Sequence, residues 1–219
     1  ANTEIYTLSL HDALPIFLTT NFPNDRVFWD LHHYFIINNT EENRRFDISW
    51  FQNLTIPVDK SHYKAWEHGN RVPDLVVNIL SVSTWKEDLS DLVEFCREVC
   101  IPYYIVFAPY HVASRLFSPP FLRVYKLNSK GQYDQIERHG VVIHEGQNIW
   151  DAQELIDLGD VIPFRIGLQQ LARCHESGSP RFRLILIDRL DLKVFPSSIE
   201  KIIGEKDREI QELKKRLNK

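Results

Sequence analysis

The chain has no methionine, three cysteines and eight glycines in 219 residues. Because none of the glycines forms a Gly-x-Gly pattern, there is no basis for predicting a nucleotide-binding loop. An odd, small number of cysteines argues against a disulfide scaffold and favours a reducing compartment, so we expect a cytoplasmic protein. No run approaches the ~18 apolar residues that a membrane-spanning helix needs, so no membrane partner is expected.

A strong charge of either sign is also missing. The 26 basic and 30 acidic side chains leave a formal net charge of -4 at pH 7, which excludes the overall positive field typical of nucleic-acid-binding domains. Two local basic sites remain, Arg44–Arg45 and Arg181–Arg183, and ordinary surface charge is the simpler interpretation of both. Cys96 and Cys100 share a helix face, but no matching pair completes a zinc site, so we expect buried thiols.

Residues 3–16, TEIYTLSLHDALPI, point to an artificial origin. They read as the in-frame translation of a common short-read sequencing adapter, and no methionine marks a start of translation. The simplest interpretation is an environmental reading frame that lost its start and was fused to adapter sequence, which should be left out of fold reasoning. We therefore expect residues 1–16 to lie outside the fold or to dock only loosely, and the natural protein to begin near Phe17.

The most informative stretch is residues 71–109. The apolar run Leu75–Leu80 is typical of a strand covered on both faces. In Glu87–Val99, apolar side chains recur at helical spacing and form one stripe, made by Leu89, Leu92, Val93, Cys96 and Val99. Tyr103–Phe107 is a second apolar run. Strand, helix and strand in this order predict a βαβ unit with a parallel pair of strands.

Upstream of this unit, the chain is aromatic-rich and then polar. Val27–Asn38 is a candidate strand, in which the neighbours His32 and His33 point to opposite faces. Asn39–Arg45 is predicted to be a polar turn.

Downstream of residue 136, polar turns at Gly140, Glu145–Gly146 and Ser177–Pro180 separate short apolar runs. Short strands are then predicted at Val141–Ile143, Phe164–Leu168 and Phe182–Ile187, and alternating polarity would continue the last of them through Asp188–Leu192. These strands could extend the main sheet or form a small separate β unit, and the sequence leaves both arrangements open.

The motifs of the βαβ unit occur in a recognisable order. They are Pro73-Asp74 before the first strand, Asn78 near its end, Ser81-Val82-Ser83-Thr84, Asp88 on the helix and Tyr104 on the second strand. This order resembles the Uma family ("Uma two") of restriction endonucleases, whose pattern is a Pro-Asp strand ending in Glu, a Ser-x-Ser-Thr turn, Asp-x-x-x-Lys on a helix and a Tyr-containing strand. Trp66–Gly69 resembles the family's approach to this strand, and Phe46–Phe51 resembles its earlier Pro-Asp strand, with Phe46 where Pro is usual. Leu122–Leu127 and Gly131–Tyr133 resemble its closing hairpin. The resemblance covers roughly Asp47 to Ile136.

The resemblance implies an α/β fold, with a restriction-endonuclease-like mixed sheet flanked by helices and a charged C-terminal helix. The core would span residues 17–136, a β-rich extension residues 137–195 and a helical or coiled-coil tail residues 196–219. It also implies a metal-dependent endonuclease that acts on DNA with magnesium or manganese, held by two acidic side chains on neighbouring strands, while a lysine orients the attacking water.

Two of the three implied catalytic groups are absent from this chain. By position, Asp47 is the first acid and the metal ligand, Asn78 stands where the second acid is expected, and Leu92 stands where the lysine is expected. Asp74 cannot share an ion with Asn78, because four strand residues separate their backbones by about 13 Å. We therefore expect a catalytically degenerate member of the family, which would use magnesium or manganese only if activity remained and otherwise no cofactor.

Two alternatives stay open. The fold could serve as a non-catalytic module that binds nucleic acid or protein. Alternatively, cleavage could survive with relocated groups around Asp47, for which the candidates are Asp88, Asp91, Glu67, Lys64 and Lys86. The deciding observation is whether a second carboxylate and a lysine converge near Asp47.

The C-terminal residues favour a charged helix. Ser197 and Glu200 have the spacing of a capping box. A heptad-like seam then follows, formed by Ile203, Ile210, Leu213 and Leu217 with Lys206 at one seam position. Such a helix would either join two chains in a homodimer or remain solvated, since roughly three heptads are marginal.

Overall fold

The computed structural model describes residues 10–57, 59–109, 119–144, 152–171, 178, 180–196, 202, 206, 208–211 and 213. Its elements are α1 (Leu10–Asn21), β1 (Arg26–Ile37), β2 (Thr40–Phe51), β3 (His62–Lys64), the 3-10 helix η1 (Ala65–His68), β4 (Leu75–Ile79), α2 (Trp85–Asp88), α3 (Asp91–Glu98), β5 (Tyr103–Ala108), β6 (Phe121–Leu127), β7 (Tyr133–Arg138), β8 (Ile143–His144), the 3-10 helix η2 (Ala152–Glu154), β9 (Ile156–Asp157), β10 (Phe164–Gln170) and β11 (Phe182–Asp188).

A seven-stranded mixed sheet forms the centre of the fold, in the order β3-β1-β2-β4-β5-β6-β7. The predicted βαβ unit is confirmed: β4 and β5 are parallel, with Leu75 opposite Tyr103 and Asn78 opposite Val106. The predicted hairpin of β6 and β7 is also present, in antiparallel register. The fold is therefore mixed α/β, with a large sheet flanked by helices, as the sequence predicts.

The helix between β4 and β5 is broken into α2 and α3, where one continuous helix was predicted. At the break, the Ser90 hydroxyl donates a hydrogen bond to the Lys86 carbonyl (2.7 Å), and such side-chain bonds to the backbone compete with regular helix geometry. After the break, α3 packs Leu92, Phe95 and Cys96 onto one face of the sheet. Cys96 is buried as expected, but Cys100 is exposed, because it follows the end of α3 in a left-handed conformation (φ 61°).

The hairpin of β1 and β2 is longer than predicted. The expected turn at residues 39–45 is wrong, because β2 already begins at Thr40 and the chain reverses at Asn38 and Asn39. Both asparagines have positive φ (49° and 63°), a conformation that asparagine tolerates and that two-residue hairpin turns require. The first half of β2 is polar because it is largely exposed, not because it turns.

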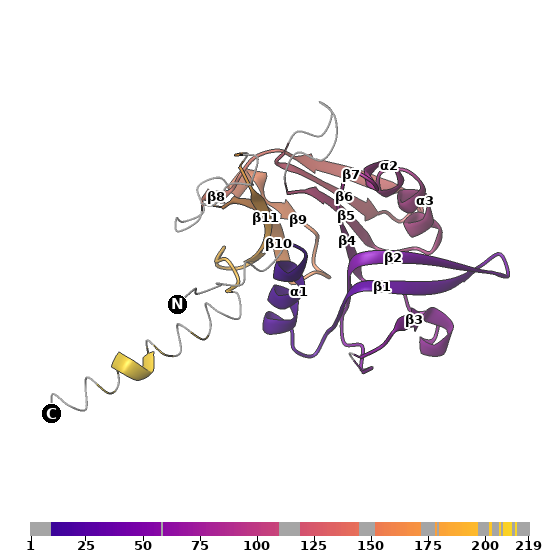
Figure 1. Ribbon diagram of the computed structural model, residues 1–219, viewed down its shortest axis with the longest axis horizontal. Coiled ribbons are helices and arrows are strands. Elements are labelled where there is room, and N and C mark those ends of the chain that lie inside the picture. The colour runs from indigo at the N-terminus through magenta and orange to yellow at the C-terminus, as the bar shows by residue number, and fades with distance from the viewer. Residues whose placement is uncertain are drawn as a thin grey trace.

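The opposite face of the large sheet is covered by α1 and a second sheet, in which β10 lies between β11 and β8 and also pairs with β9. Figure 1 shows α1 beside β10 and β11, away from α2 and α3. Trp50 of the large sheet contacts Phe164 of the second sheet, with ring centroids 5.4 Å apart. The late strands therefore form a separate sheet that shares a hydrophobic core with the large one.

The predicted continuation of the last strand through Leu192 is wrong. β11 ends at Asp188, whose carboxylate accepts hydrogen bonds from the backbone N–H groups of Leu190 (2.7 Å) and Asp191 (3.2 Å). These bonds close a turn, after which Phe195 donates a backbone bond to Leu186. The alternating polarity of this segment therefore reflects a turn that folds back on β11.

The N-terminal expectation is also wrong in part. α1 begins at Leu10, and the Leu14 side chain is only 6% exposed, in the same hydrophobic cluster as Phe17 and Leu18. From Leu14 onward, this segment therefore packs in the core that the two sheets share. Residues 1–9 lie outside the described residues, and the adapter interpretation of the sequence stays a prediction.

Replacing Leu14 tests whether this segment packs in the core or docks only loosely. If the helix packs as described, Leu14→Ala should lower the free energy of unfolding by about 2 kcal/mol, at the low end of buried leucine truncations, and the thermal midpoint by ~6 °C. Thr19→Ala on the exposed side of α1 is the control and should change the free energy by less than ~0.5 kcal/mol. Equal midpoints for both variants in calorimetry would favour a loosely docked segment.

The predicted tail lies mostly outside the described residues, including Ser197, Glu200, Ile203 and Leu217. The described positions Ile210 and Leu213 are helical and exposed, and the homodimer stays a prediction. Among the residues that the structure describes, no helix is long and apolar enough to cross a membrane.

Candidate functional site

A cavity of about 360 Å³ lies where β2, β4 and the two short helices meet. All three positions that the resemblance singles out, Asp47, Asn78 and Leu92, line it. The other lining residues are Asp30, Arg44, Arg45, Ile79, Ser81, Thr84, Glu87 and Asp88. Residues from distant parts of the sequence are thus brought together at the end of β4.

Asp47 is held against the neighbouring strand. One of its carboxylate oxygens accepts a hydrogen bond from the backbone N–H of Ile79 (2.6 Å). Its own backbone N–H donates to the side-chain oxygen of Asn78 (3.3 Å). These two bonds connect β2 to the end of β4 and fix the Asp47 carboxylate beside the Asn78 amide.

Asn78 links Asp47 to the helix. Its amide nitrogen donates a hydrogen bond to Oδ1 of Asp88 (2.9 Å), and both side chains are buried. The amide oxygen faces the backbone of Asp47 and the amide nitrogen faces Asp88, so both ends of the side chain are bonded. A glutamate at this position would instead bring a second negative charge against Asp88.

Asp88 is the most unusual group in the cavity. It is 4% exposed, and its Oδ2 atom is buried with no hydrogen-bond partner among the described residues. Burial raises the pKa of this carboxyl, hydrogen bonds from Asn78 and Thr84 counteract the rise, and the charges of Asp47 and Glu87 add to it. The Asp47 and Asp88 carboxylates are therefore close enough to influence each other.

The turn after β4 sets the position of Asp88. Ser81 Oγ accepts a hydrogen bond from the Thr84 N–H (3.2 Å), and Trp85 then donates to the Ser81 carbonyl to start α2. At the end of this short helix, the Tyr104 hydroxyl of β5 donates to the backbone carbonyl of Asp88 (2.8 Å). The Ser-x-Ser-Thr turn therefore starts the helix that carries Asp88, and the tyrosine of the second strand holds the backbone of Asp88 at its end.

Leu92 supplies no polar group to the cavity. It is 4% exposed and packs in the cluster that includes Phe95 and Cys96. The lining residues include no lysine. A second carboxylate therefore converges with Asp47, as the relocated-group alternative requires, but a lysine does not.

Arg44 and Arg45 supply the positive charge of the cavity. Arg45 forms an ion pair with Asp30, which stands in β1 with a positive φ of 57°. Arg44 forms an ion pair with Glu42 (3.5 Å), and its guanidinium lies 4.6 Å from the centre of the Phe95 ring. The sequence marks the two arginines as a local basic site, but it carries no signal for Asp30, which lies within an aromatic-rich strand.

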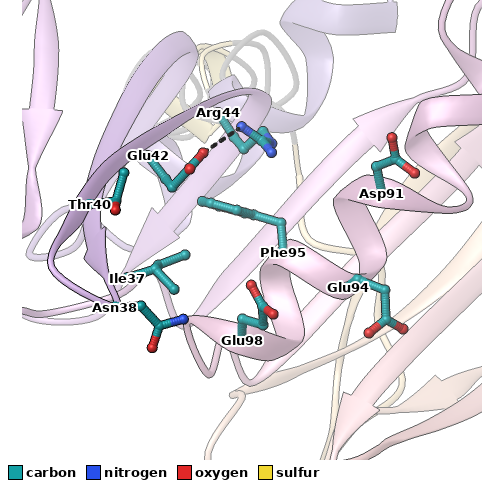
Figure 2. A pocket seen from close by; sticks show the side chains of 9 residues that line it. All are labelled: Ile37, Asn38, Thr40, Glu42, Arg44, Asp91, Glu94, Phe95 and Glu98. Carbon is teal, nitrogen blue, oxygen red and sulfur yellow. Dashed lines mark ion pairs between the residues drawn. The ribbon is translucent and has the colours of Figure 1, made fainter.

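Arg44 also lines a second cavity of about 520 Å³, between the β1–β2 hairpin and α3. Figure 2 shows Phe95 reaching from α3 toward the hairpin, with Arg44 and its partner Glu42 on the far side of the ring. This packing fixes the Arg44 side chain at the boundary between the two cavities.

Other charged residues considered from the sequence lie elsewhere. Asp91 lines the second cavity, and Lys64, Glu67 and Lys86 line neither cavity. The Asp74 carboxylate accepts a hydrogen bond from the backbone of Gln52 (2.8 Å) and pairs with Arg71 (3.3 Å). Asp74 is therefore a structural residue that connects the start of β4 to the end of β2.

The ligand set that the resemblance implies for a metal, Asp47 with residue 78, does not fit here. Asn78 carries no charge, and its oxygen faces a backbone N–H of Asp47. In the described part of the chain, no three His, Cys, Asp or Glu side chains gather closely enough to hold a metal ion by themselves. Among the described residues, Oδ2 of Asp88 is buried without a hydrogen-bond partner.

Comparison with known proteins finds likeness at the level of structure. No protein-family model and no curated protein matches the chain. Among solved structures, the chain is similar to "a putative nuclease belonging to DUF820 from Anabaena variabilis ATCC 29413", with 17% sequence identity and a TM-score of 0.41 over 61% of this chain and 69% of that one. A likeness of this extent does not identify binding or reacting residues, so the function has to be argued from this chain's own side chains.

Proposed function

We propose that this chain is a catalytically degenerate nuclease-type domain that binds nucleic acid without cleaving it. The observation that carries the proposal is the single cavity that contains Asp47, Asn78 and Leu92 together with Arg44 and Arg45. The three positions that the motif order singles out line this cavity, which supports the proposal, and Asn78 and Leu92 stand there in place of the acid and the lysine that the resemblance implies.

Two of these side chains, Leu92 and Asn78, explain why cleavage would be lost. Hydrolysis needs a group that orients or activates the attacking water, and Leu92 has none. Asn78 is neutral and bonded at both ends, so it neither carries charge nor moves a proton. Asp47 keeps its carboxylate, but one of its oxygens is bonded to the Ile79 N–H.

Binding would rest on the arginines. A guanidinium matches the geometry of a phosphate and keeps its charge at any physiological pH. Arg44 and Arg45 lie on consecutive positions of β2 and both line the cavity. Because both pair with acidic neighbours, we expect weak, salt-dependent binding with a Kd on the order of 10⁻⁶ to 10⁻⁴ M.

Binding can be tested by fluorescence anisotropy with a labelled DNA or RNA oligonucleotide at several salt concentrations. Arg44→Ala with Arg45→Ala should weaken binding about tenfold or more and should reduce the slope of log affinity against log salt by about 2. Arg97→Ala is the matched control, since Arg97 is paired with Glu94 on α3 away from this cavity. No binding by the unaltered chain would refute the proposal and leave the protein-binding alternative.

A second candidate function, a live nuclease with relocated ligands, is favoured by the Asp88 carboxylate in the same cavity. Incubating plasmid DNA with the unaltered chain and magnesium or manganese distinguishes this live nuclease from the non-cleaving binding domain. We expect no cleavage. Cleavage that Asp47→Ala abolishes would show that a lysine is dispensable here and would establish the second candidate.

A further inference from the structure

One face of the large sheet is open to solvent along β3 and the far part of the β1–β2 hairpin, which Figure 1 shows on the side away from the second sheet. Leu31 and Phe35 of β1 and Tyr63 of β3 are buried in the cluster that includes α3. Because side chains alternate along a strand, their neighbours point to the opposite face. Strand pairing brings these neighbours together, and we call the set the open face: His32, Tyr34 and Ile36 of β1, His62 and Lys64 of β3, and Glu41, Asn43 and Arg45 of β2.

Aromatic rings lie side by side on the open face. The centroid of the Tyr34 ring is 6.5 Å from that of His32 and 5.9 Å from that of His62. At the edge of the face, the Lys64 ammonium lies 5.7 Å from the centre of the Trp66 ring. Tyr34 and Trp66 are both partly exposed, so a ligand can reach part of each ring.

Cations stand on the strands at either side of β1. Lys64 of β3 is opposite Tyr34, and Arg45 of β2 is opposite His32. Glu41, the acidic residue of the open face, pairs with Ile36 near the tip of the hairpin, beyond the rings. Arg45 also lines the cavity of the candidate site, so the open face is continuous with that cavity.

We propose that the open face binds single-stranded nucleic acid, with unpaired bases stacked on Tyr34 and Trp66 and with phosphates beside Lys64 and Arg45. The inference rests on the proposed function and names its substrate class as unpaired strands. Aromatic side chains that stack on bases, next to cations that follow the backbone, are the usual means of binding single strands.

A duplex fits the open face less well. Its bases are paired and stacked inside the helix, so they cannot stack on these rings, and its binding depends mainly on neutralised phosphates. This chain has a formal net charge of -4, and Arg45 is already paired with Asp30. Stacking supplies an attraction that does not depend on net charge, which favours a strand with unpaired bases.

A protein partner fits the open face less well too. The buried centre of a protein interface is depleted of charged residues. Here the aliphatic side chain is Ile36, and the rest of the open face consists of polar, charged and ring side chains. Charge next to accessible rings therefore matches a polynucleotide better than an apolar protein surface.

The first experiment compares two labelled probes by fluorescence anisotropy with the full chain. They are an oligothymidine of ~12 nucleotides, within the range that single-strand-binding domains cover, and a DNA duplex of equal length. The single strand should bind about tenfold more tightly than the duplex. Equal affinity for the two probes would overturn the inference.

The second experiment repeats the single-strand titration with variants of the rings. Tyr34→Ala and Trp66→Ala should each weaken binding about fivefold or more. Tyr34→Phe keeps the ring and should bind like the unaltered chain. Circular dichroism checks the fold of each variant, and because the two rings belong to different elements, either folded alanine variant is sufficient for the test.

Lys64→Ala and Lys86→Ala form a matched pair. Each lysine lies over a tryptophan ring, at 5.7 Å from Trp66 and 5.6 Å from Trp85, but Lys86 belongs to α2, on the other side of the large sheet. Lys64→Ala should weaken single-strand binding several-fold, whereas Lys86→Ala should leave it unchanged.

The outcomes separate this inference from the proposed function. If folded Tyr34→Ala and Trp66→Ala bind the single strand like the unaltered chain, or if Tyr34→Phe loses as much affinity as Tyr34→Ala, stacking on the open face is refuted. The proposed function then stands if Arg44→Ala with Arg45→Ala still weakens binding. If neither probe binds the unaltered chain, the proposed function falls, and this inference falls with it.

Discussion

Lowering the pH from 7 to 4 is expected to reduce the free energy of unfolding by about 3 kcal/mol through His33 alone. Burial lowers the pKa of this imidazole from 6.5 to about 3. As the pH falls below 6.5, the unfolded chain takes up a proton at His33, whereas the folded chain does not until about pH 3. The stability that the neutral ring contributes is therefore complete above pH 6.5 and is lost as the pH falls toward 3.

The neighbours of His33 explain why the neutral ring is preferred. Nδ1 lies 2.9 Å from the Leu31 carbonyl, and Nε2 lies 2.8 Å from the Ser49 hydroxyl. A neutral ring donates to the carbonyl and accepts from the hydroxyl, which satisfies both nitrogens. Aromatic rings surround the imidazole, from Phe28, Phe35, Phe46, Phe51 and Tyr63.

Urea unfolding at pH 7 and pH 4 measures this effect. The double variant His33→Phe with Ser49→Ala removes both polar groups, and its loss of stability over this pH range should be about 3 kcal/mol smaller than that of the unaltered chain. His32→Gln changes the exposed neighbour and should leave most of the pH dependence in place. If the His33 variant keeps the full pH dependence, other groups cause the acid sensitivity.

The part of the fold that could be predicted is the part that local patterns determine. Leu75–Ile79 and Tyr103–Ala108 are buried on both faces, so their strands read as continuous apolar runs. The helical stripe of Leu92 and Cys96 is visible because one face of α3 packs on the sheet. Even there, periodicity does not reveal the break at Ser90, where the hydroxyl donates to the Lys86 carbonyl.

Other features depend on contacts between distant residues. Thr40–Arg45 looks like a turn because it is polar, yet pairing with β1 makes it a strand. The sequence left open whether the late strands extend the large sheet, and the contact between Trp50 and Phe164 shows that they stack on it.

The candidate site was predictable in position but not in its bonding. The motif order placed Asp47, Asn78 and Leu92 together, and they do line one cavity. Asp88 was one of several possible replacement acids, and spacing alone could not show that Asn78 donates to it. Asp30 was missed altogether, because it reaches the cavity through a left-handed backbone conformation within β1.

The Asn78→Glu/Leu92→Lys double variant is expected to lose less free energy of unfolding than the sum of the losses of its two single variants. Asn78→Glu alone replaces the donor to Asp88 with a like charge, and Leu92→Lys alone buries an ammonium at about 2 to 3 kcal/mol. Residue 92 lies four positions after Asp88 and lines the same cavity. A lysine there can pair with the buried carboxylates, so the double-mutant cycle should show a favourable coupling of about 1 kcal/mol or more.

The same double variant is expected to gain magnesium-dependent cleavage of DNA that the unaltered chain lacks. The carboxylate introduced at position 78 would stand next to Asp47 at the end of β4, and the ammonium group introduced at position 92 would stand beside the attacking water, where Leu92 offers nothing polar. Relative to Asn78→Glu alone, the added lysine should raise the cleavage rate by ~10²-fold or more, the usual range for a positioned acid–base group. Nicking of supercoiled plasmid measures the gain, and a further Asp47→Ala change should abolish it. A folded double variant that stays inactive would mean that the missing charges at positions 78 and 92 are not what prevents cleavage.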